Sequence, residues 1–247
     1  MLQNQMNKSL LIIPFYNEEK RIPHSEFLEA FERYQDVGFL LVNDGSADKT
    51  LDILADFASK FSHVKVLNLK KNGGKAEAIR SGILQVKELS YDYLGYLDAD
   101  LSTPIAELIR LLEFSIANQN LQIVMGTRIK LLGNNVVRSS RRHYFGRIFA
   151  TIISNFILKT AVYDTQCGAK IIKKEVAFLL FEKEFRTKWL FDVEMLLRLK
   201  KHAGKLEEIV AEMPLNTWIE KGDTKIKLKE FISFPWQLIM IYFKDAV

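Results

Sequence analysis

The chain has 247 residues, which is enough for one large α/β domain or two small domains. With 48% hydrophobic and 26% charged residues, and with few glycines and prolines, its composition excludes a collagen-like or disordered chain. The single cysteine, Cys167, excludes an intramolecular disulfide and a cysteine-rich zinc site, and indicates a reducing compartment. The net charge of +5 is too small to indicate nucleic-acid binding by itself, but it suits an anionic substrate or an anionic membrane surface.

The apolar segments of the chain are all short. The first, at residues 10–13, ends at Pro14 and is too short for the core of a signal peptide. No run of about 18 apolar residues predicts a helix that spans a bilayer. The tail at 231–243, FISFPWQLIMIYF, has the length of a buried helix or an interfacial segment. We therefore expect a cytoplasmic protein, either free or peripheral on the cytoplasmic face of a membrane.

The first half of the chain alternates between two kinds of pattern. Short apolar runs with the composition of buried strands occur at residues 10–13, 39–42, 64–67, 93–97 and 123–125. Amphipathic helical patterns lie between them, as at 27–34, 51–58 and 105–112. This alternation predicts an α/β fold, a mostly parallel sheet flanked by helices on both faces. Because ligands of such sheets bind at the carboxyl ends of the strands, functional residues are expected directly after each run.

The second half is less regular. Residues 128–142 form a basic stretch that predicts a long loop, and helices are predicted at 144–163, 175–181 and 192–201. There is no internal repeat and no Pro/Ser-rich linker. We therefore predict one domain over residues 1–225, followed by an amphipathic helical tail of the same domain at 226–247.

The first three strand ends carry polar motifs. PFYNEE follows the first strand at 14–19, and VNDGSAD spans the end of the second at 42–48. Each motif alone is also ordinary turn and helix-cap chemistry, but together they predict one crevice in which Asp44 accepts from a base or a ribose hydroxyl. After the third strand, Gly74 and Lys75 open a helix and form a seat for a phosphate or a base. The spacing of a P-loop or of a dinucleotide fingerprint is absent.

The fourth strand ends in LDADLS at 97–102. In an extended chain, Asp98 and Asp100 point the same way, and their repulsion is relieved when Mg²⁺ or Mn²⁺ bridges them to phosphate oxygens. Such a cation would neutralise the charge that grows on a departing diphosphate. A helix cap at Ser102 or Thr103, followed by Pro104, accounts for part of the motif but not for two acids at the end of a buried strand.

In their order and spacing, these motifs resemble the inverting glycosyltransferases of family 2, which have the GT-A fold. Within that family the chain is most similar to polyprenyl-phosphate sugar transferases of the dolichyl-phosphate β-glucosyltransferase kind. The resemblance covers residues 8–222 and rests on the four motifs above, on GTR at 126–128, on VYDTQCGAKIIKKEVA at 162–177 and on WLFDVEMLLRLK at 189–200. Two departures are Asn43, where the family often has a second Asp, and the lack of the transmembrane anchor that many relatives carry.

The resemblance implies roles for several residues. It implies that Pro14, Tyr16, Glu18 and Asp44 hold the nucleobase and ribose, while Asp98 and Asp100 meet the ribose and the metal on the diphosphate. It also implies that Arg128 and Arg142 meet an acceptor phosphate, which suits the fork of a guanidinium. For Arg138, Arg141 and Arg142, a solvated basic loop is an equally good reading. Trp218 and the residues after it are implied to close over the sugar nucleotide.

By family position Asp192 is the candidate catalytic base. A phosphomonoester with a second pKa of about 6 is already ionised at pH 7 and needs no base, whereas a sugar hydroxyl does. Asp192 is therefore expected either to orient the acceptor or to take its proton, and it also suits the N-cap of the helix that follows. Cys167 has no histidine partner in sequence reach and is expected to be a buried structural thiol.

The sequence thus predicts a metal-dependent inverting enzyme that transfers a sugar, with UDP-glucose as the expected donor, to a polyprenyl phosphate. One alternative keeps the fold and transfers the sugar to a glycan or soluble hydroxyl acceptor. A second alternative is a non-catalytic protein that binds a sugar nucleotide. The aromatic residues and lysines of the tail predict contact with the domain, with a membrane surface or with a second copy of the chain.

Overall fold

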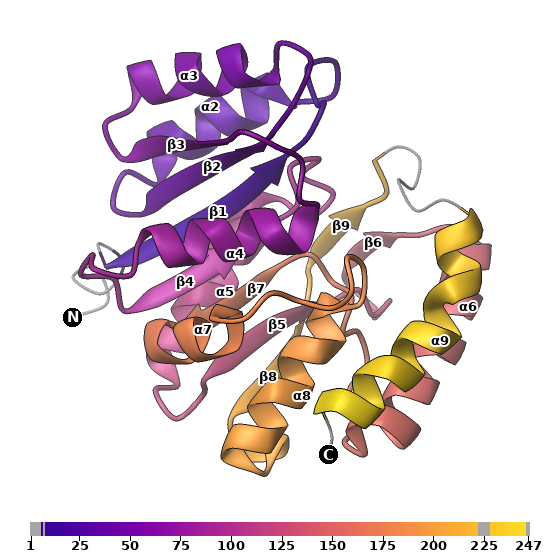
Figure 1. Cartoon of the computed structure of the whole chain (residues 1–247). Coiled ribbons are helices and arrows are strands. Elements are labelled where there is room, and N and C mark those ends of the chain that lie inside the picture. The colour runs from indigo at the N-terminus through magenta and orange to yellow at the C-terminus, as the bar shows by residue number, and fades with distance from the viewer. Residues whose placement is uncertain (1–5, 7, 222–227, 246–247) are drawn as a thin grey trace.

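The computed structural model describes residue 6, residues 8–221 and residues 228–245 (Figure 1). Seven strands form one sheet in the order β3-β2-β1-β4-β7-β5-β8, and two further strands, β6 and β9, form a small second sheet. The strands are β1 (Ser9–Phe15), β2 (Gly38–Asp44), β3 (Val64–Leu69), β4 (Tyr93–Tyr96), β5 (Ile123–Thr127), β6 (Asn135–Val137), β7 (Lys170–Lys173), β8 (Val210–Pro214) and β9 (Thr217–Ile219). In the large sheet only β7 runs antiparallel to its neighbours, β4 and β5. The predicted mostly parallel sheet is confirmed.

Helices cover both faces of the large sheet. They are α2 (His24–Arg33), α3 (Thr50–Lys60), α4 (Lys75–Gln85), α5 (Ile105–Ala117), α6 (Ser140–Ile152), the π-helical turn η1 (Ile153–Leu158), α7 (Lys174–Phe181), α8 (Phe191–Ala203), the 3-10 turn η2 (Leu206–Glu208) and α9 (Leu228–Asp245). Successive residues of a strand point to opposite faces, so Leu11 and Ile13 join one core while Leu10 and Ile12 join the other. The first core packs under α2, α3 and α5, and the second under α4, α7 and α8.

Two predictions for the second half are wrong in detail, and two strands of the large sheet are not predicted. The predicted loop at 128–142 contains β6 and the first residues of α6. The predicted helix at 144–163 is α6 followed by η1, which ends at Leu158, and the next residue, Lys159, is in the left-handed region. Strands β7 and β8 were not predicted. β7 has only two apolar residues between lysines, and β8 is half-buried with Glu212 and Pro214 in it. Neither segment has the apolar run that marks a buried strand.

The C-terminal helix α9 packs on the domain by one face. Phe234, Leu238 and Ile241 are buried, and the ring of Phe234 lies 5.7 Å from that of Phe149 on α6. Figure 1 shows α9 alongside α6 at one side of the molecule. The predicted boundary at residue 225 falls outside the described residues. In the ranges that the structure describes, no helix combines the length and apolar character needed to cross a bilayer.

Candidate active site

The carboxyl ends of β1, β2 and β4 lie next to one another in the sheet, and their loops interlock. Asn17, after β1, accepts a hydrogen bond from the Ala47 N–H at 2.9 Å, and its own N–H donates to Ser46 Oγ at 3.0 Å. The next residue, Glu18, is buried and pairs with Arg21 at 3.0 Å. Tyr16 is 40% exposed beside this buried acid. The loop after β1, which carries two of the predicted nucleotide contacts (Tyr16 and Glu18), is therefore held in place by the loop after β2, and the third, Pro14, lies within β1.

Asp44 organises the glycine loop that opens α4. Its carboxylate accepts from the N–H groups of Gly73 and Gly74 and from Asn72 Nδ2, each at 2.8 Å. Burial raises the pKa of Asp44, although the two backbone N–H groups favour the ionised form. Gly74 has a φ of +88°, which favours glycine, and it precedes the first residue of α4, Lys75. The structure thus brings Asp44, Gly74 and Lys75 together, as the strand-end motifs predicted.

Lys75 faces the acidic pair at the end of β4. Its Nζ lies 2.5 Å from Asp98 Oδ1, and the carboxylate of Asp192 is a second negative charge that acts on it. Burial disfavours the charge of Asp98, but the ammonium of Lys75 outweighs burial and lowers the pKa of Asp98. Asp100 differs, because burial and the negative charge of Asp98 raise its pKa. Lys75 therefore balances one of the two carboxylates and leaves the other without an ammonium partner among the described residues.

A divalent cation fits this pair of carboxylates. No group of three His, Cys, Asp or Glu side chains in the described part of the chain is arranged to hold a metal ion alone. Two carboxylates are nevertheless what Mg²⁺ ordinarily takes from a protein, because water and substrate phosphates supply its other ligands. Burial and then the negative charge of Asp98 raise the pKa of Asp100, so a further positive charge there would favour its ionised form. A cation held by Asp98 and Asp100 would supply that charge.

The predicted helix caps are wrong. The N-cap of α5 is Pro104 and makes no side-chain cap bond, while Ser102 Oγ accepts from the N–H of Lys221 at 3.2 Å. The N-cap of α8 is Leu190, again with no side-chain cap bond, and Asp192 lies inside the first turn. Ser102 thus binds the backbone of the segment after β9, and the carboxylate of Asp192 does not cap its helix.

Asp192 is buried against two donors that come from different strands. Its Oδ1 accepts from the Tyr96 hydroxyl at 2.5 Å and lies 2.7 Å from Nζ of Lys170. Burial and the charge of Asp192 raise the pKa of Tyr96 well above its usual value, so the hydroxyl keeps its proton and donates. Lys170 is completely buried, and no motif in the sequence marked it as a site residue. The signal available was a lysine at the start of a segment whose neighbours, Ile171 and Ile172, are apolar.

Arg128, the predicted acceptor residue, already has a carboxylate partner. Its Nε and Nη2 each lie 2.7 Å from an oxygen of Asp164, and its guanidinium lies 5.5 Å from the centre of the Trp218 ring. Burial opposes the charge of Asp164, but Arg128 outweighs it and lowers the pKa of this carboxyl. An incoming phosphate would therefore meet a guanidinium whose orientation is set by Asp164. Arg142 lies in α6, and its side chain is outside the described part of the structure.

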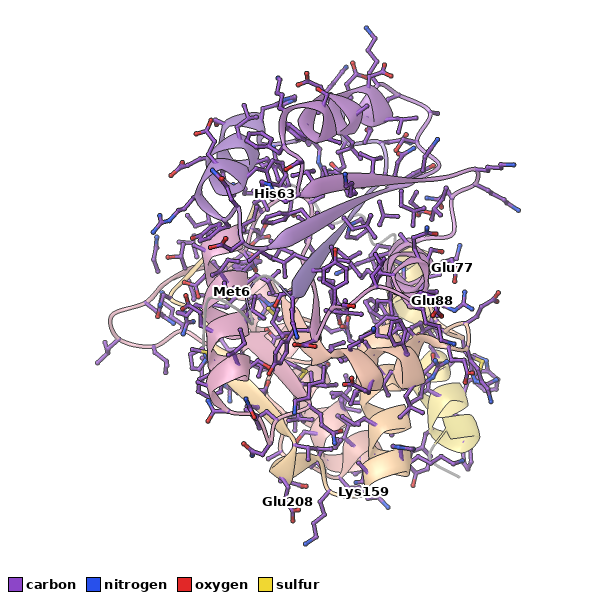
Figure 2. The ribbon with its side chains drawn as sticks, turned by 90° about the vertical axis from the view of Figure 1, so that its left-hand side faces the viewer. Met6, His63, Glu77, Glu88, Lys159 and Glu208 are labelled. Carbon is purple, nitrogen blue, oxygen red and sulfur yellow. The ribbon has the colours of Figure 1, made fainter. Side chains whose placement is uncertain are left out.

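Glu212 on β8 holds the backbone next to the ion pair of Arg128 and Asp164. Its two carboxylate oxygens accept from the N–H groups of Tyr163 at 2.6 Å and Asp164 at 2.7 Å. Burial raises the pKa of Glu212. A separate surface hollow of about 430 Å³, lined by Lys159 and Glu207 among others, lies at the end of η1. Figure 2 shows Lys159 well apart from Glu77, which is on the first turn of α4, so this hollow is not the site built around Lys75.

Comparisons with known proteins identify the family of the chain. The sequence model described as Glycosyl transferase family 2 matches residues 10–178. A dolichyl-phosphate beta-glucosyltransferase of Trichomonas vaginalis is 31% identical over 245 residues, covering 93% of this chain and 71% of that protein. The human dolichyl-phosphate beta-glucosyltransferase is 27% identical, covering 92% of this chain and 77% of its own. Both relatives therefore align with nearly all of the chain.

A solved structure shares the fold. Glucosyl-3-phosphoglycerate synthase from Mycobacterium tuberculosis, in complex with Mn²⁺, uridine diphosphate and glucosyl-3-phosphoglycerate, aligns with a TM-score of 0.70 at 17% identity. The alignment covers 97% of this chain and 81% of that one. At this level of identity the likeness concerns the fold alone, and it confirms the predicted GT-A architecture.

The ion pair between Lys75 and Asp98 predicts how a cation binds in the absence of nucleotide. A Lys75→Met variant should bind Mn²⁺ about fivefold more tightly than the wild type, because a half-exposed ion pair that the metal must displace is worth about 1 kcal/mol. Isothermal titration calorimetry with MnCl₂ measures this affinity. Lys71→Met, which removes an exposed lysine from the same loop, is the matched control and should leave it unchanged. Unchanged or weaker Mn²⁺ binding by Lys75→Met would contradict the prediction.

The ion pair between Arg128 and Asp164 predicts a pH-dependent loss of stability. Asp164→Asn should lower the free energy of unfolding by about 3 kcal/mol at pH 7, since Arg128 is left as an unpaired, largely buried charge. The pKa of Asp164 is lowered from an ordinary value of 3.8, so its contribution is complete above that pH and disappears as the pH falls through the lower folded-state value.

Urea unfolding at pH 7, 5 and 3 tests this expectation. The difference between wild type and Asp164→Asn should be constant from pH 7 to 5 and should shrink below about pH 4. Asp56→Asn, which removes an exposed partner of Lys60, is the control and should change stability by less than about 0.5 kcal/mol. A difference that does not shrink between pH 5 and pH 3 would argue against the pair as its source.

Proposed function

The chain belongs to glycosyl transferase family 2, and on that premise we propose that it transfers glucose from UDP-glucose to dolichyl phosphate or a related polyprenyl phosphate. The observation that carries the proposal is the cluster of Lys75, Asp98 and Asp100 at the carboxyl end of β4, in a chain whose relatives are dolichyl-phosphate glucosyltransferases. The cluster offers a cation seat beside the N-terminus of α4, which suits a nucleoside diphosphate.

The donor would lie along the carboxyl ends of β1, β2 and β4. Asp44 holds Gly73 and Gly74 so that the first turn of α4 and the ammonium of Lys75 face the diphosphate. Asp98 and Asp100 would hold Mg²⁺ or Mn²⁺, which supplies charge neutralisation for the departing UDP. Pro14 at the end of β1 and the loop residues Tyr16 and Glu18 would line the nucleoside side of the same crevice.

The environment of Asp192 supports a phosphate acceptor. An acceptor phosphate, ionised at pH 7 because its second pKa is about 6, would attack the anomeric carbon directly and displace UDP with inversion. A hydroxyl acceptor would need a base, and Oδ1 of Asp192 is already engaged by the Tyr96 hydroxyl and the Lys170 ammonium. We therefore assign Asp192 to orienting the substrates, with Arg128 on the acceptor side and Arg142 as a second candidate contact.

The helices α6 and α9 carry exposed apolar side chains that could contact the membrane in which a lipid acceptor lies. The exposed large apolar residues of α6 and η1 recur every four residues, so they share a face: Tyr144, Ile148, Ile152 and Phe156. On the adjacent α9, Trp236, Ile239 and Phe243 are exposed as well, at 72%, 48% and 67%. Large apolar side chains that gather on a helical surface are typical of interfacial contact. We propose that this surface, the α6–α9 face, rests on the membrane that holds the acceptor.

An assay of donors against acceptors tests the proposed reaction. Purified chain, UDP-glucose and detergent-solubilised dolichyl phosphate should release UDP in Mg²⁺ or Mn²⁺, and Asp100→Asn should lose at least about 100-fold in kcat, the usual cost of removing electrostatic stabilisation of a leaving group. Asp52→Asn, on the exposed side of α3, is the control and should retain full activity. UDP release with glycans or soluble alcohols, and none with dolichyl phosphate, would instead favour a hydroxyl acceptor. UDP binding without turnover on any acceptor would favour a non-catalytic role.

Flotation with liposomes tests the proposed membrane surface. The wild type should float with vesicles that contain anionic phospholipid, and the double variant Phe156→Ser/Trp236→Ser should float at least about fivefold less, because it removes two large, exposed aromatic side chains from the α6–α9 face. Leu89→Ser, an exposed apolar residue away from that face, is the control and should float like the wild type. If neither protein floats and the wild type forms a dimer that the double variant loses, the face is a contact between copies of the chain.

A further inference from the structure

Lys170 contacts Asp192 and the backbone of the turn that lies against Asp98, so it links the two walls of the proposed site. It begins β7, the antiparallel strand between β4 and β5, and lies in register with Tyr96 on one side and Met125 on the other. Its ammonium is completely buried. It lies 2.7 Å from Asp192 Oδ1 and donates to the Cys167 carbonyl at 2.6 Å. A single cation thus joins a helix residue to a turn that precedes its own strand.

The turn that Lys170 holds lies directly against Asp98. The residue after Cys167 is Gly168, and a Cβ added there would collide with the Asp98 carboxyl group. The carboxyl group of Asp98 therefore packs against the backbone of this turn, and a shift of the turn would move the carboxylate. Because Lys170 fixes the Cys167 carbonyl, it sets the position of Asp98 without touching it.

The other wall is the carboxylate of Asp192. The Tyr96 hydroxyl and the Lys170 ammonium converge on its Oδ1, and the Nζ of Lys170 lies 5.4 Å from the centre of the Tyr96 ring. Two donors on one oxygen fix the rotation of a carboxylate more firmly than either donor alone. The same ammonium thereby sets the orientation of Asp192 and the position of Asp98.

Stability alone does not account for a charge at this position. A buried ion pair pays a large desolvation cost, and well-packed apolar residues often replace such a pair at no loss of stability. The two residues that follow Lys170 in the strand, Ile171 and Ile172, are buried and apolar, so the strand accepts such side chains. The two contacts of the ammonium, Asp192 and the Cys167 carbonyl, both belong to the walls of the proposed site.

We infer that Lys170 is a positioning residue of the proposed glucosyltransferase, which aligns Asp98 on the donor side and Asp192 on the acceptor side. The inference rests on the proposed function for the identity of the substrates. It predicts that loss of Lys170 weakens donor binding as well as turnover, whereas loss of Asp192 affects turnover alone.

Four variants separate this role from a merely structural one. Lys170→Met removes the ammonium from both walls, Gly168→Ala presses on Asp98 only, and Asp192→Asn changes only the other wall. The double variant Lys170→Met/Asp192→Asn leaves no unpaired buried charge and should regain much of the stability that Lys170→Met loses. Glu194→Gln neutralises another buried carboxylate of α8, which pairs with Arg198 at 2.6 Å, and is the matched control.

The measurements are UDP affinity in the presence of Mn²⁺, kcat and KM for transfer, and the midpoint of thermal unfolding. Lys170→Met and the double variant should both bind UDP about tenfold more weakly, as is usual when a residue behind a metal ligand is lost. Gly168→Ala should share this loss, and Asp192→Asn and Glu194→Gln should not. The kcat of Lys170→Met should fall about 100-fold, the scale of a misplaced reacting group.

A stable double variant that binds UDP with wild-type affinity would overturn the inference, as would a Lys170→Met variant whose kcat falls only in proportion to its unfolded fraction. UDP binding requires no acceptor, so the predicted pattern of affinities holds even if the proposed acceptor is wrong. Failure of the proposed function and failure of this inference are therefore distinguishable.

Discussion

The balance of charge around the carboxyl end of β4 is the constraint on which the rest of the site depends. Asp98, Asp100 and Asp192 gather there, and like charges in a partly buried crevice repel one another strongly. Lys75 reaches Asp98 from the first turn of α4, and Lys170 reaches Asp192 from β7. Two ammonium groups for three carboxylates leave a net negative charge, and burial together with the charge of Asp98 raises the pKa of Asp100. The remaining negative charge would be neutralised by a divalent cation that binds together with the diphosphate of the donor.

The antiparallel strand β7 makes this arrangement possible. A parallel strand inserted between β4 and β5 would bring its amino end to the opposite edge of the sheet, away from the aspartates. Because β7 runs the other way, the Cys167–Lys170 segment enters the sheet at the edge where β4 ends. Gly168 then supports Asp98, and Lys170 reaches Asp192. The reversal of one strand thus supplies the floor of the site.

The parts of this site that local patterns reveal are those where an apolar run ends in polar residues. The runs before Asp44 and Asp98 have the composition of buried strands, so the sheet, its parallel core and the strand-end acids could all be predicted. Partners distant in sequence could not. Lys170 meets Asp192 across 22 residues and Arg128 meets Asp164 across 36, and neither pair has any periodicity that links its members. The two predicted caps failed for a related reason, because each polar side chain had a stronger partner elsewhere in the fold.

The charged groups on the proposed acceptor side are also already paired. Arg128 is already oriented by Asp164, and the backbone N–H groups of Tyr163 and Asp164 are held by the carboxylate of Glu212. Asp192 has one oxygen committed to two donors. A site whose groups are this firmly engaged is better suited to orienting a nucleophile that is already ionised than to removing a proton from a neutral one. A lipid phosphate presented at the proposed α6–α9 face brings such a nucleophile, so the chain would need only to hold it in line with the anomeric carbon.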